Sequence, residues 1–367
     1  MATPIPFSKV ILSMAKQQIE KDNRQLAQRI VPVRMKDIAR DLGLSTVTIS
    51  KVLRNHSDIS EATRKKVLKR MKEMDYRPNL AARSLITGRS WTIGLVVPDL
   101  LYPFFAQIAK ALAAEIRKQG YSLIITSSEE DPELEKQEIE QLLTRRVDVI
   151  AIASSQWTVE SFRSIEQHRI PYILIDRYFR GLAANFVGVD DVAAGKLAAD
   201  HLIEQGCRRI VHIRGPEVST ALGRLDGFQR GLAAHKLTPL NIVSSSGSVD
   251  GSGSEGGYET MHMLLQKKTI PDGVFCYNDP IAMGAMRAIL DAGLRIPEDI
   301  AVVGCGNVLN ADFLRVPLST IDQDSTSIGT RAAELAMSLT TAKTTQRPKT
   351  HLTKPKLIIR ASSQRRK

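Results

Sequence analysis

The chain is poor in cysteine and in long apolar runs. Among its 367 residues are three cysteines, which lie far apart and form no CxxC pair: Cys207, Cys276 and Cys305. An odd, dispersed set argues against a secreted disulfide framework and against a structural zinc site, and it indicates a reducing compartment. No stretch reaches the roughly 18 uninterrupted apolar residues of a membrane span, and the first 30 residues lack a signal-peptide core. We therefore expect a cytoplasmic protein.

The sequence also lacks the motifs of common enzyme classes. It contains no GxSxG nucleophile elbow, no HExxH and no phosphate-binding loop, and its seven histidines show no metal-ligand spacing. An enzyme on an α/β scaffold remains the alternative, with Asp176 and His212, or Cys305, as conceivable catalytic groups. We predict no catalytic residue, no metal site and no cofactor.

The charge is distributed unevenly along an otherwise ordinary globular composition. Residues 1–90 carry 19 Lys and Arg against 8 Asp and Glu, a net charge of +11. Residues 91–342 carry 23 against 31, a net charge of −8, and residues 343–367 carry 9 basic residues and no acid. A basic head on an acidic body is typical of a polyanion-binding module fused to another domain. A solvated charged surface is the alternative. The length predicts two or three domains.

Residues 35–53 have the pattern of two short helices joined by a glycine turn. Ile38, Ala39 and Leu42 form one helical face, Gly43 supplies the turn, and Ser45 is placed to N-cap the second helix. The inward residues expected from the second and third helices are Val47 or Thr48, Ile49, Val52, Leu53, Val67, Leu68, Met71 and Met74. This arrangement predicts a helix-turn-helix.

The second helix opens with small side chains that could approach base edges in a DNA major groove. These are Ser45, Thr46 and Thr48, and Lys51 one turn later could reach a guanine or a phosphate. The third helix offers a basic surface for phosphates, formed by Arg64, Lys65, Lys66, Lys69, Arg70 and Lys72.

Five blocks in this region resemble the lactose-repressor family in order and spacing. They are Asp-Ile-Ala, Gly-Leu-Ser-x-x-Thr-Ile-Ser-Lys-Val-Leu, Ser-x-x-Thr-Arg, Tyr-Arg-Pro-Asn and Ala-Arg-Ser-Leu, all within residues 37–85. The resemblance implies a hinge helix after Tyr76 that orders only on operator DNA, with Leu85 as a wedge in the minor groove. A core or dimer-contact role is the alternative for Leu85. The implied DNA-binding residues are Ser45, Thr46, Val47, Thr48, Ser50, Lys51, Asn55, Arg64, Tyr76, Asn79, Ala82, Arg83 and Leu85.

From residue 91 onward, short β-rich runs alternate with amphipathic stretches. Strands are expected near residues 93–97, 121–125, 147–152, 172–175, 209–213, 273–277 and 300–303. Helices are expected near residues 105–119, 133–145, 159–168, 193–205, 222–235, 257–267 and 280–292. The two rounds of alternation predict two doubly wound parallel sheets, with a crossing between lobes at residues 187–191.

The same family resemblance continues through this region and implies a two-lobed, periplasmic-binding-protein-like fold. It rests on Val-Val-Pro-Asp-x-x-x-Pro-Phe-Phe at 96–105, Ile-Asp-Arg at 175–177, Asn-Asp at 278–279 and Leu-Ile-Ile-Arg at 357–360. Ligand would sit between the lobes, at the carboxyl ends of the strands. Candidate effector-binding residues are Phe104, Phe105, Asp176, Thr220, Arg224, Asn278 and Asn307, with Arg224 matching the effector-gripping arginine of the family. For each polar residue a cap or a buried structural pair is the alternative, and we expect Asp279 to be the N-cap of its helix.

One position departs from the family pattern. After the strand near Val303 the family usually continues Gly-aromatic-Asp-Asp, whereas this chain has Gly304-Cys305-Gly306-Asn307. Glycine thus stands where an acid often binds ligand hydroxyls. Either Asn307, Asn278 or Asp176 substitutes for the acid, or the ligand carries a negative charge that an acid would repel.

Taken together, these patterns predict a small all-α helix-turn-helix domain followed by an α/β region with two doubly wound parallel-sheet lobes. The expected segments are an extension at 1–33 (disordered or not truly translated), the helix-turn-helix at 34–78, the hinge at 79–90, two lobes at 91–363 changing near 187–191 and 318–322, and a basic tail at 364–367. The expected function is a transcriptional repressor under allosteric control by a small-molecule effector such as a sugar or related metabolite. Its expected partners are palindromic double-stranded operator DNA and a second copy of the chain, with no membrane. A transport-type binding protein does not fit the basic head.

Overall fold

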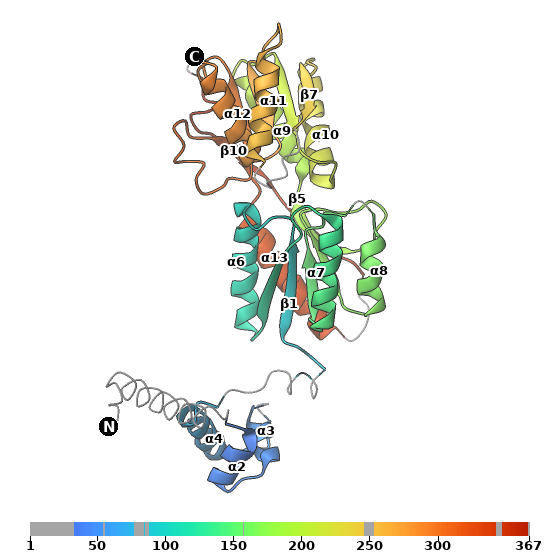
Figure 1. Ribbon diagram of the computed structural model, residues 1–367, viewed down its shortest axis with the longest axis vertical. Coiled ribbons are helices and arrows are strands. Elements are labelled where there is room, and N and C mark those ends of the chain that lie inside the picture. The colour runs from blue at the N-terminus through green and yellow to red at the C-terminus, as the bar shows by residue number, and fades with distance from the viewer. Residues whose placement is uncertain are drawn as a thin grey trace, which may run out of the picture. The chain divides into compact units, whose positions relative to one another are not determined.

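Two units with separate hydrophobic cores make up the chain, Met1–Thr87 and Gly88–Lys367 (Figure 1). The structure is a computed structural model, and it describes residues 33–53, 56–76, 84, 88–156, 158–245, 253–342 and 347–365. The predicted extension, except for Val33, and most of the predicted hinge helix lie outside the described residues.

Three helices form the described part of unit 1: α2 (Met35–Leu42), α3 (Thr46–Leu53) and α4 (Glu61–Glu73). Helix α2 ends at Gly43, whose φ of 63° lies in the left-handed region that glycine adopts readily. The Ser45 hydroxyl accepts a hydrogen bond from the Thr48 amide at 3.0 Å, so it caps α3 as predicted. The helix-turn-helix prediction is confirmed.

The core of unit 1 follows the predicted pattern with two changes. Its buried residues come from all three helices and are Ile38, Ala39, Ile49, Val52, Val67 and Met71. Leu68, predicted to be inward, is 49% exposed because the α4 stripe runs through Val67, Met71 and Met74, at spacings of four and three. Val47 is 60% exposed and Thr48 is half-buried, so Thr48 is the more inward of the two alternatives.

Unit 2 contains two six-stranded sheets. The sheet of lobe 1 is parallel throughout, in the order β11 (Thr350–Thr353), β5 (Asn185–Val189), β4 (Tyr172–Ile175), β3 (Val149–Ile152), β1 (Thr92–Val97), β2 (Ser122–Ser127). The sheet of lobe 2 has the order β12 (Lys356–Ile358), β10 (Ser319–Asp322), β9 (Ala301–Cys305), β8 (Gly273–Cys276), β6 (Ile210–Arg214), β7 (Asn241–Ser244). The predicted pair of parallel sheets is confirmed, except that β12 pairs antiparallel with β10.

Helices cover both faces of each sheet. In lobe 1 they are α6 (Pro103–Lys118) and α13 (Ser325–Thr341) on one face, and α7 (Pro132–Thr144) and α8 (Glu160–Gln167) on the other. In lobe 2 they are α9 (Asp191–Glu204) and α10 (Ser219–Ala234) on one face, and α11 (Ser254–Leu265) and α12 (Asp279–Asp291) on the other.

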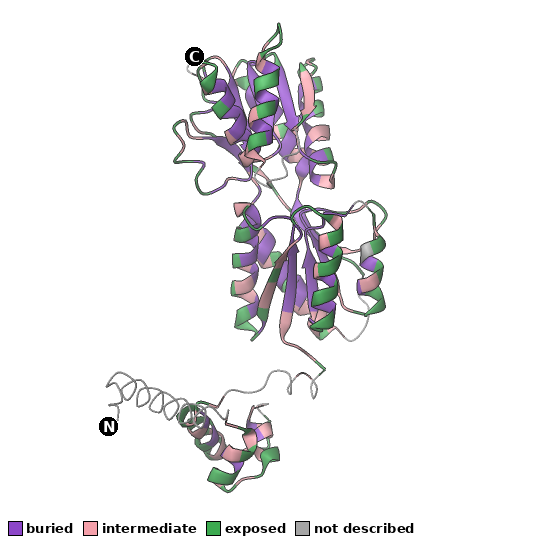
Figure 2. Cartoon of the chain, in the orientation of Figure 1, coloured by how far each residue is buried: buried purple, intermediate pink, exposed green. Residues whose placement is uncertain are grey.

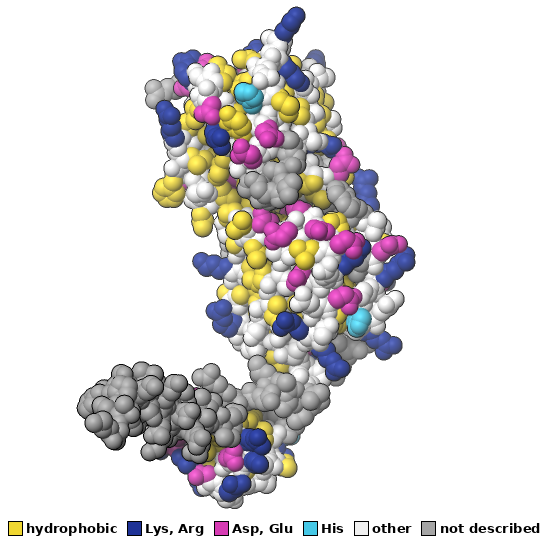
Figure 3. All heavy atoms as spheres, in the orientation of Figure 1, with side chains coloured by type: hydrophobic (Ala, Val, Ile, Leu, Met, Phe, Trp, Pro, Cys, Tyr) yellow, Lys and Arg dark blue, Asp and Glu magenta, His cyan; other side chains and the backbone are white. Residues whose placement is uncertain are grey.

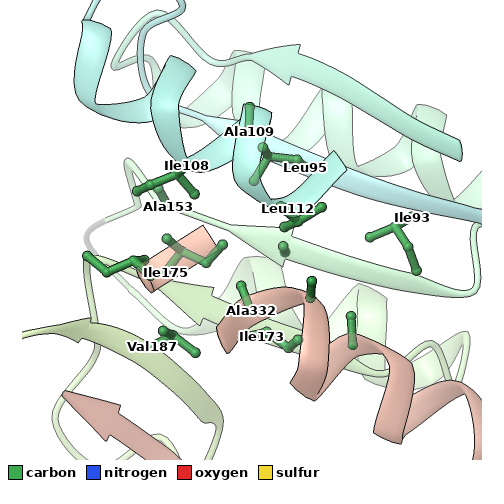
Figure 4. Packing of buried hydrophobic residues seen from close by; sticks show 14 of the residues in the cluster. Ile93, Leu95, Ile108, Ala109, Leu112, Ala153, Ile173, Ile175, Val187 and Ala332 are labelled. Carbon is green, nitrogen blue, oxygen red and sulfur yellow. The ribbon is translucent and has the colours of Figure 1, made fainter. Parts of the chain in front are cut away.

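Alternation along the strands supplies both cores of a lobe. Ile93, Leu95 and Val97 of β1 pack toward α6 and α13, as Figure 4 shows for the first two. Val96 points to the opposite face and packs toward α7 and α8. Strands covered on both faces are buried throughout, which is why these runs are continuously apolar (Figure 2).

Along the part of unit 2 that the structure describes, the chain crosses between the lobes three times. It crosses after β5, which precedes α9 of lobe 2, and again after β10, which precedes α13 of lobe 1. The third crossing joins β11 to β12 and was not predicted. Five strands, β5, β7, β10, β11 and β12, and helix α13 were not predicted. Strands β7, β11 and β12 contain no buried residue, so they lack the apolar run that marks the predicted strands.

Candidate functional site

The first turn of α3 presents small side chains to solvent. Ser45, Thr46 and Val47 are exposed, and Thr48 and Ser50 are half-buried. Two hydroxyls and one branched methyl pair in this position can contact base edges and the methyl group of thymine without steric conflict.

Two of the predicted basic contacts in unit 1 have partners within the fold. Lys51 Nζ lies 2.5 Å from Asp58 Oδ2, and this ion pair lowers the pKa of the Asp58 carboxyl. Arg64 donates to the carbonyl oxygens of His56 at 2.8 Å and Val52 at 3.4 Å, so it holds the C-terminal end of α3. With only 15% of its side chain exposed, Arg64 is placed as a structural anchor.

Fewer basic side chains of α4 are available to DNA phosphates than the sequence indicates. Arg70 joins Asp41 of α2 at 2.5 Å and Glu73 at 3.0 Å. Lys65, Lys66 and Lys72 are exposed.

The half-buried Tyr76 packs against the unit 1 core. The other predicted DNA contacts lie outside the described residues: Asn55, Asn79, Ala82, Arg83 and Leu85.

Unit 2 has a cavity of about 340 Å³ between its two lobes, at the carboxyl ends of the strands. Both lobes line it, and Gln323 contributes from the second crossing. The structure brings together five of the predicted effector-binding residues here: Phe104, Phe105, Asp176, Arg224 and Asn278. Open α/β sheets commonly bind ligands at such a location.

Arg224 reaches both of the first two crossings. Its Nε donates to Asp191 Oδ1, beside the first crossing, and its Nη2 donates to Gln323 Oε1, at the second, both at 2.8 Å. Its Nη1 donates to the Tyr277 carbonyl oxygen at 2.8 Å. A guanidinium has five N–H groups, so two remain for a ligand. Burial raises the pKa of Asp191 to about 7, and the Arg224 charge opposes that rise.

Asp176 ends β4 in a strained turn. Its φ is 63°, and the Arg177 amide donates to the Ile175 carbonyl oxygen at 2.6 Å across it. A non-glycine residue held in such a conformation costs about 1–3 kcal/mol and is found most often at functional sites. The Asp176 carboxyl is 4% exposed, its Oδ1 has no hydrogen-bond partner among the described residues, and burial raises its pKa.

The N-cap role expected of Asp279 belongs to Asn278, and Asp279 is a buried structural group. Asn278 is the N-cap of α12, since its Oδ1 accepts from the Ile281 amide at 2.9 Å, and it also lines the cavity. Asp279 is instead buried and accepts from the Thr320 hydroxyl at 2.5 Å and the Val308 amide at 2.9 Å. Burial raises the pKa of Asp279 to about 6.

The remaining predicted effector residues contribute less to the cavity. Thr220 bonds the Tyr277 hydroxyl at 2.8 Å, and Asn307 accepts from Arg360 at 3.0 Å. Neither is among the lining residues that the structure describes. Phe104 and Phe105 do line the cavity, but they are 2% and 4% exposed and belong mostly to the lobe 1 core.

Tyr102 was missed by the sequence reasoning and accounts for Gly306. Its hydroxyl donates to the Cys305 carbonyl oxygen at 3.3 Å, and its ring packs against the cores of both lobes. A Cβ atom placed on Gly306 would lie 2.8 Å from that hydroxyl. The space of a side chain at position 306 is therefore taken by a residue of the opposite lobe. Only the position of this tyrosine just before the Pro-Phe-Phe block hinted at its role.

No helix in the described part of the chain combines the length and apolar character of a membrane span. Among the same residues, no group of three or more His, Cys, Asp or Glu is arranged to hold a metal ion.

Comparison with known proteins covers both units. Residues 34–79 match bacterial regulatory proteins of the lacI family, and residues 199–363 match the periplasmic binding protein-like domain. The HTH-type transcriptional repressor PurR of Haemophilus influenzae (strain PittEE) is 34% identical over 336 residues, which are 89% of this chain and 98% of that protein.

Solved structures give the same result. The Lac repressor dimer bound to operator and the anti-inducer ONPF has a TM-score of 0.80 at 26% identity, over 90% of this chain and 99% of that one. A periplasmic binding protein/LacI transcriptional regulator of Alkaliphilus metalliredigens, complexed with D-xylulofuranose, has a TM-score of 0.66 at 28% identity, over 75% and 99%. By its match to the PurR repressor over nearly that protein's whole length, and by its helix-turn-helix and two-lobed units, the chain belongs to the lacI family of bacterial regulatory proteins.

Proposed function

We propose that this protein is a transcriptional repressor whose affinity for operator DNA is set by a small molecule bound in the unit 2 cavity. The observation that carries the proposal is the exposed first turn of α3 in a chain that also has an interlobe cavity. Its PurR relatives are transcriptional repressors, and the similar Lac repressor structure holds operator DNA and an anti-inducer. This supports a regulator over an enzyme. Because chromosomal DNA is the target, we place the protein's action in the cytoplasm.

Unit 1 would read DNA with α3 in the major groove. Thr46 and Val47 would contact base edges, and Lys51 would exchange Asp58 for a guanine or a phosphate. Lys65, Lys66 and Lys72 are exposed and would contact phosphates, which gives affinity without sequence preference. By family resemblance, Leu85 would open the centre of the site from the minor groove.

A homodimer would place two copies of unit 1 on a palindromic site. Unit 2 offers an apolar surface for this: Leu101 is 79% exposed, Leu309 76% and Phe313 87%. Leu101 precedes Tyr102, whose bond to Cys305 brings its loop beside the loop that carries Leu309 and Phe313. Apolar side chains gather along one edge of unit 2 in Figure 3. The Lac repressor relative is a dimer bound to operator.

Binding of effector and operator would be coupled through the crossings. A ligand that contacts Arg224 also contacts, through it, the segments at Asp191 and Gln323 about which the lobes can rotate. Such coupling is reciprocal and typically amounts to about 1–3 kcal/mol.

Selection of DNA by the full-length protein tests this function. Random duplexes are enriched on the protein, and affinities are then measured by fluorescence anisotropy. We expect one palindromic sequence to be enriched and Val47→Ala to weaken its binding by about tenfold, equivalent to about 1.4 kcal/mol. Gln229→Ala, an exposed change on α10, is the matched control. Equal affinity for selected and random DNA would contradict the proposal.

A further inference from the structure

The charged groups that line the unit 2 cavity do not balance. Three guanidinium groups line it, and each has a carboxylate partner. Arg177 meets Glu130 at 2.6 and 2.8 Å, Arg214 meets Glu217 at 2.9 Å, and Arg224 meets Asp191 at 2.8 Å.

Two lining carboxylates remain without a cation, Asp99 and Asp176. They are 6% and 4% exposed, and no Lys or Arg forms an ion pair with either one among the described residues. Asp99 Oδ1 accepts from the Leu101 amide at 2.7 Å, but Asp99 Oδ2 and Asp176 Oδ1 have no hydrogen-bond partner there. Buried carboxylate oxygens in this state are costly unless a donor is supplied.

The two carboxylates belong to one corner of the cavity. Asp99 follows β1 and Asp176 follows β4, and both strands are neighbours of β3, so their carboxyl ends share an edge of the sheet. Burial raises the pKa of both groups, and the nearby Glu130 carboxylate raises each further. The charges of Arg224 and Arg177 oppose the rise at Asp176, although neither arginine forms an ion pair with it.

Two arginines act electrostatically on Asp176, and each already has a carboxylate partner: Arg224 pairs with Asp191 and Arg177 with Glu130. Acidic side chains gather in a band beside the junction of the two lobes in Figure 3. An anionic ligand would meet this excess of carboxylates with all three guanidinium charges already matched.

We propose that the effector carries a protonated nitrogen, and that this group binds between Asp99 and Asp176 in lobe 1. The proposal rests on the function inferred above and names the chemical class of the effector. An ammonium group supplies both a positive charge and hydrogen-bond donors to these two carboxylates. Lobe 2 adds no carboxylate at position 306, because the Tyr102 hydroxyl fills that space. Packing against Tyr102 therefore accounts for glycine at position 306 without requiring a negatively charged ligand.

Matched ligand series test this assignment on the full-length protein. The probes are glucosamine, glucose and gluconate; putrescine, 1,4-butanediol and succinate; and tyramine, 4-(2-hydroxyethyl)phenol and 4-hydroxyphenylacetate, each up to 10 mM. The readouts are the rise in Tm, since a ligand of the native state stabilises it by mass action, and calorimetric Kd for any compound that shifts it. We expect at least one amine to bind about tenfold or more tightly than its neutral and acidic counterparts.

Variants assign the binding to the two carboxylates. Asp176→Asn and Asp99→Asn keep the side-chain shape and remove the charge, so each should weaken the amine about tenfold or more. Asp291→Asn, on the exposed side of α12, is the matched control and should leave Kd unchanged. The Tm of each ligand-free variant establishes that it folds.

The proposal would be overturned by equal or tighter binding of a neutral or acidic counterpart, by no shift with any amine, or by amine binding that survives in both variants. Operator affinity is measured separately in the same samples. Loss of the amine preference with operator binding intact refutes only the effector class, whereas absence of selective DNA binding refutes the function.

Discussion

At position 306 the absence of a side chain leaves room for the Tyr102 hydroxyl. Gly306 has a φ of 139°, which side-chain-bearing residues rarely adopt, and the Tyr102 hydroxyl stands 2.8 Å from where its Cβ would lie. The Tyr102 ring in turn contacts the cores of both lobes. The glycine and the tyrosine therefore depend on each other, although they are 204 positions apart in the chain.

We expect Gly306→Ala to destabilise unit 2 by about 1–3 kcal/mol, through contact with the Tyr102 hydroxyl and through backbone strain. Tyr102→Phe removes that hydroxyl and should recover part of the loss. Urea unfolding of the wild type, both single variants and the double variant measures the coupling. Strictly additive effects would show that the two residues do not compete for space.

His212 gives unit 2 a sensitivity to acid. It is fully buried beside Phe275 and Phe228, and its Nδ1 lies 3.0 Å from the Phe275 carbonyl oxygen. Burial lowers its pKa from 6.5 to about 4. The unfolded chain therefore takes up a proton at a higher pH than the folded chain does. The stabilising contribution is complete above pH 6.5 and is lost as the pH falls toward 4.

Lowering the pH from 7 to 5 should cost about 2 kcal/mol of unfolding free energy through His212 alone. His212→Phe should flatten the dependence of stability on pH over that interval, whatever its stability at pH 7. Chemical unfolding at a series of pH values measures this. His168→Gln, an exposed change at the end of α8, should keep the wild-type slope. An unchanged slope in His212→Phe would assign the acid sensitivity to other groups.

Among the elements, α9 and α10 pack closely enough to require glycine at their contact. A Cβ atom on Gly195 of α9 would lie 1.9 Å from the Arg224 carbonyl oxygen, and one on Gly227 of α10 would lie 1.9 Å from the Val192 carbonyl oxygen. Both clashes are with backbone, so no side-chain rotation relieves them. This close approach sets the position of α10, and with it that of Arg224.

Gly227→Ala should separate α9 from α10 and cost about 3 kcal/mol, at the upper end of the usual cost of overpacking. It should also weaken effector binding, because Arg224 moves with the helix. Gln229→Ala, at an exposed position of α10, should change neither the stability nor effector binding. Thermal unfolding and ligand titration measure the two effects. Wild-type stability in Gly227→Ala would contradict this account of the helix pair.

The whole molecule separates its charges between its ends and its middle. Residues 1–90 have a net charge of +11, and residues 91–342 have −8. Release of counterions from DNA by the basic residues makes affinity fall steeply with salt. The basic residues 1–90 are therefore suited to an anionic partner, and the acidic cavity is suited to a cationic one.

Operator affinity should fall linearly with the logarithm of salt concentration, and Lys66→Ala should reduce the slope by about 1. Lys66 is chosen because it is exposed on α4. Lys268→Ala, an exposed change in unit 2, is the control and should keep the wild-type slope. Anisotropy titrations between 50 and 300 mM salt measure both slopes. The assignment of α4 to the phosphates fails if the two variants have the same slope.

Local patterns were sufficient for most of the long elements, although helix α13 (Ser325–Thr341) was not predicted. The apolar spacing at Ile38 and Ile49, the cap at Ser45 and the alternation around β1 and α6 all act over a few residues, so they could be recognised along the chain. The motif blocks then pointed to the family. Strands β11 and β12 escaped because they contain no buried residue that would mark an apolar run, and their pairing is non-local.

The sequence by itself determined the class of protein: a basic helix-turn-helix head, two α/β lobes and a lacI-family regulator. Only the tertiary structure decided which side chains share the cavity and which are already paired. Arg64 and Asn307 are bonded within the fold, Tyr102 fills the space at Gly306, and Asp99 and Asp176 are left without a cation. The physical reason is that charge pairing and steric exclusion depend on distances between residues tens to hundreds of positions apart, and those distances are set by packing.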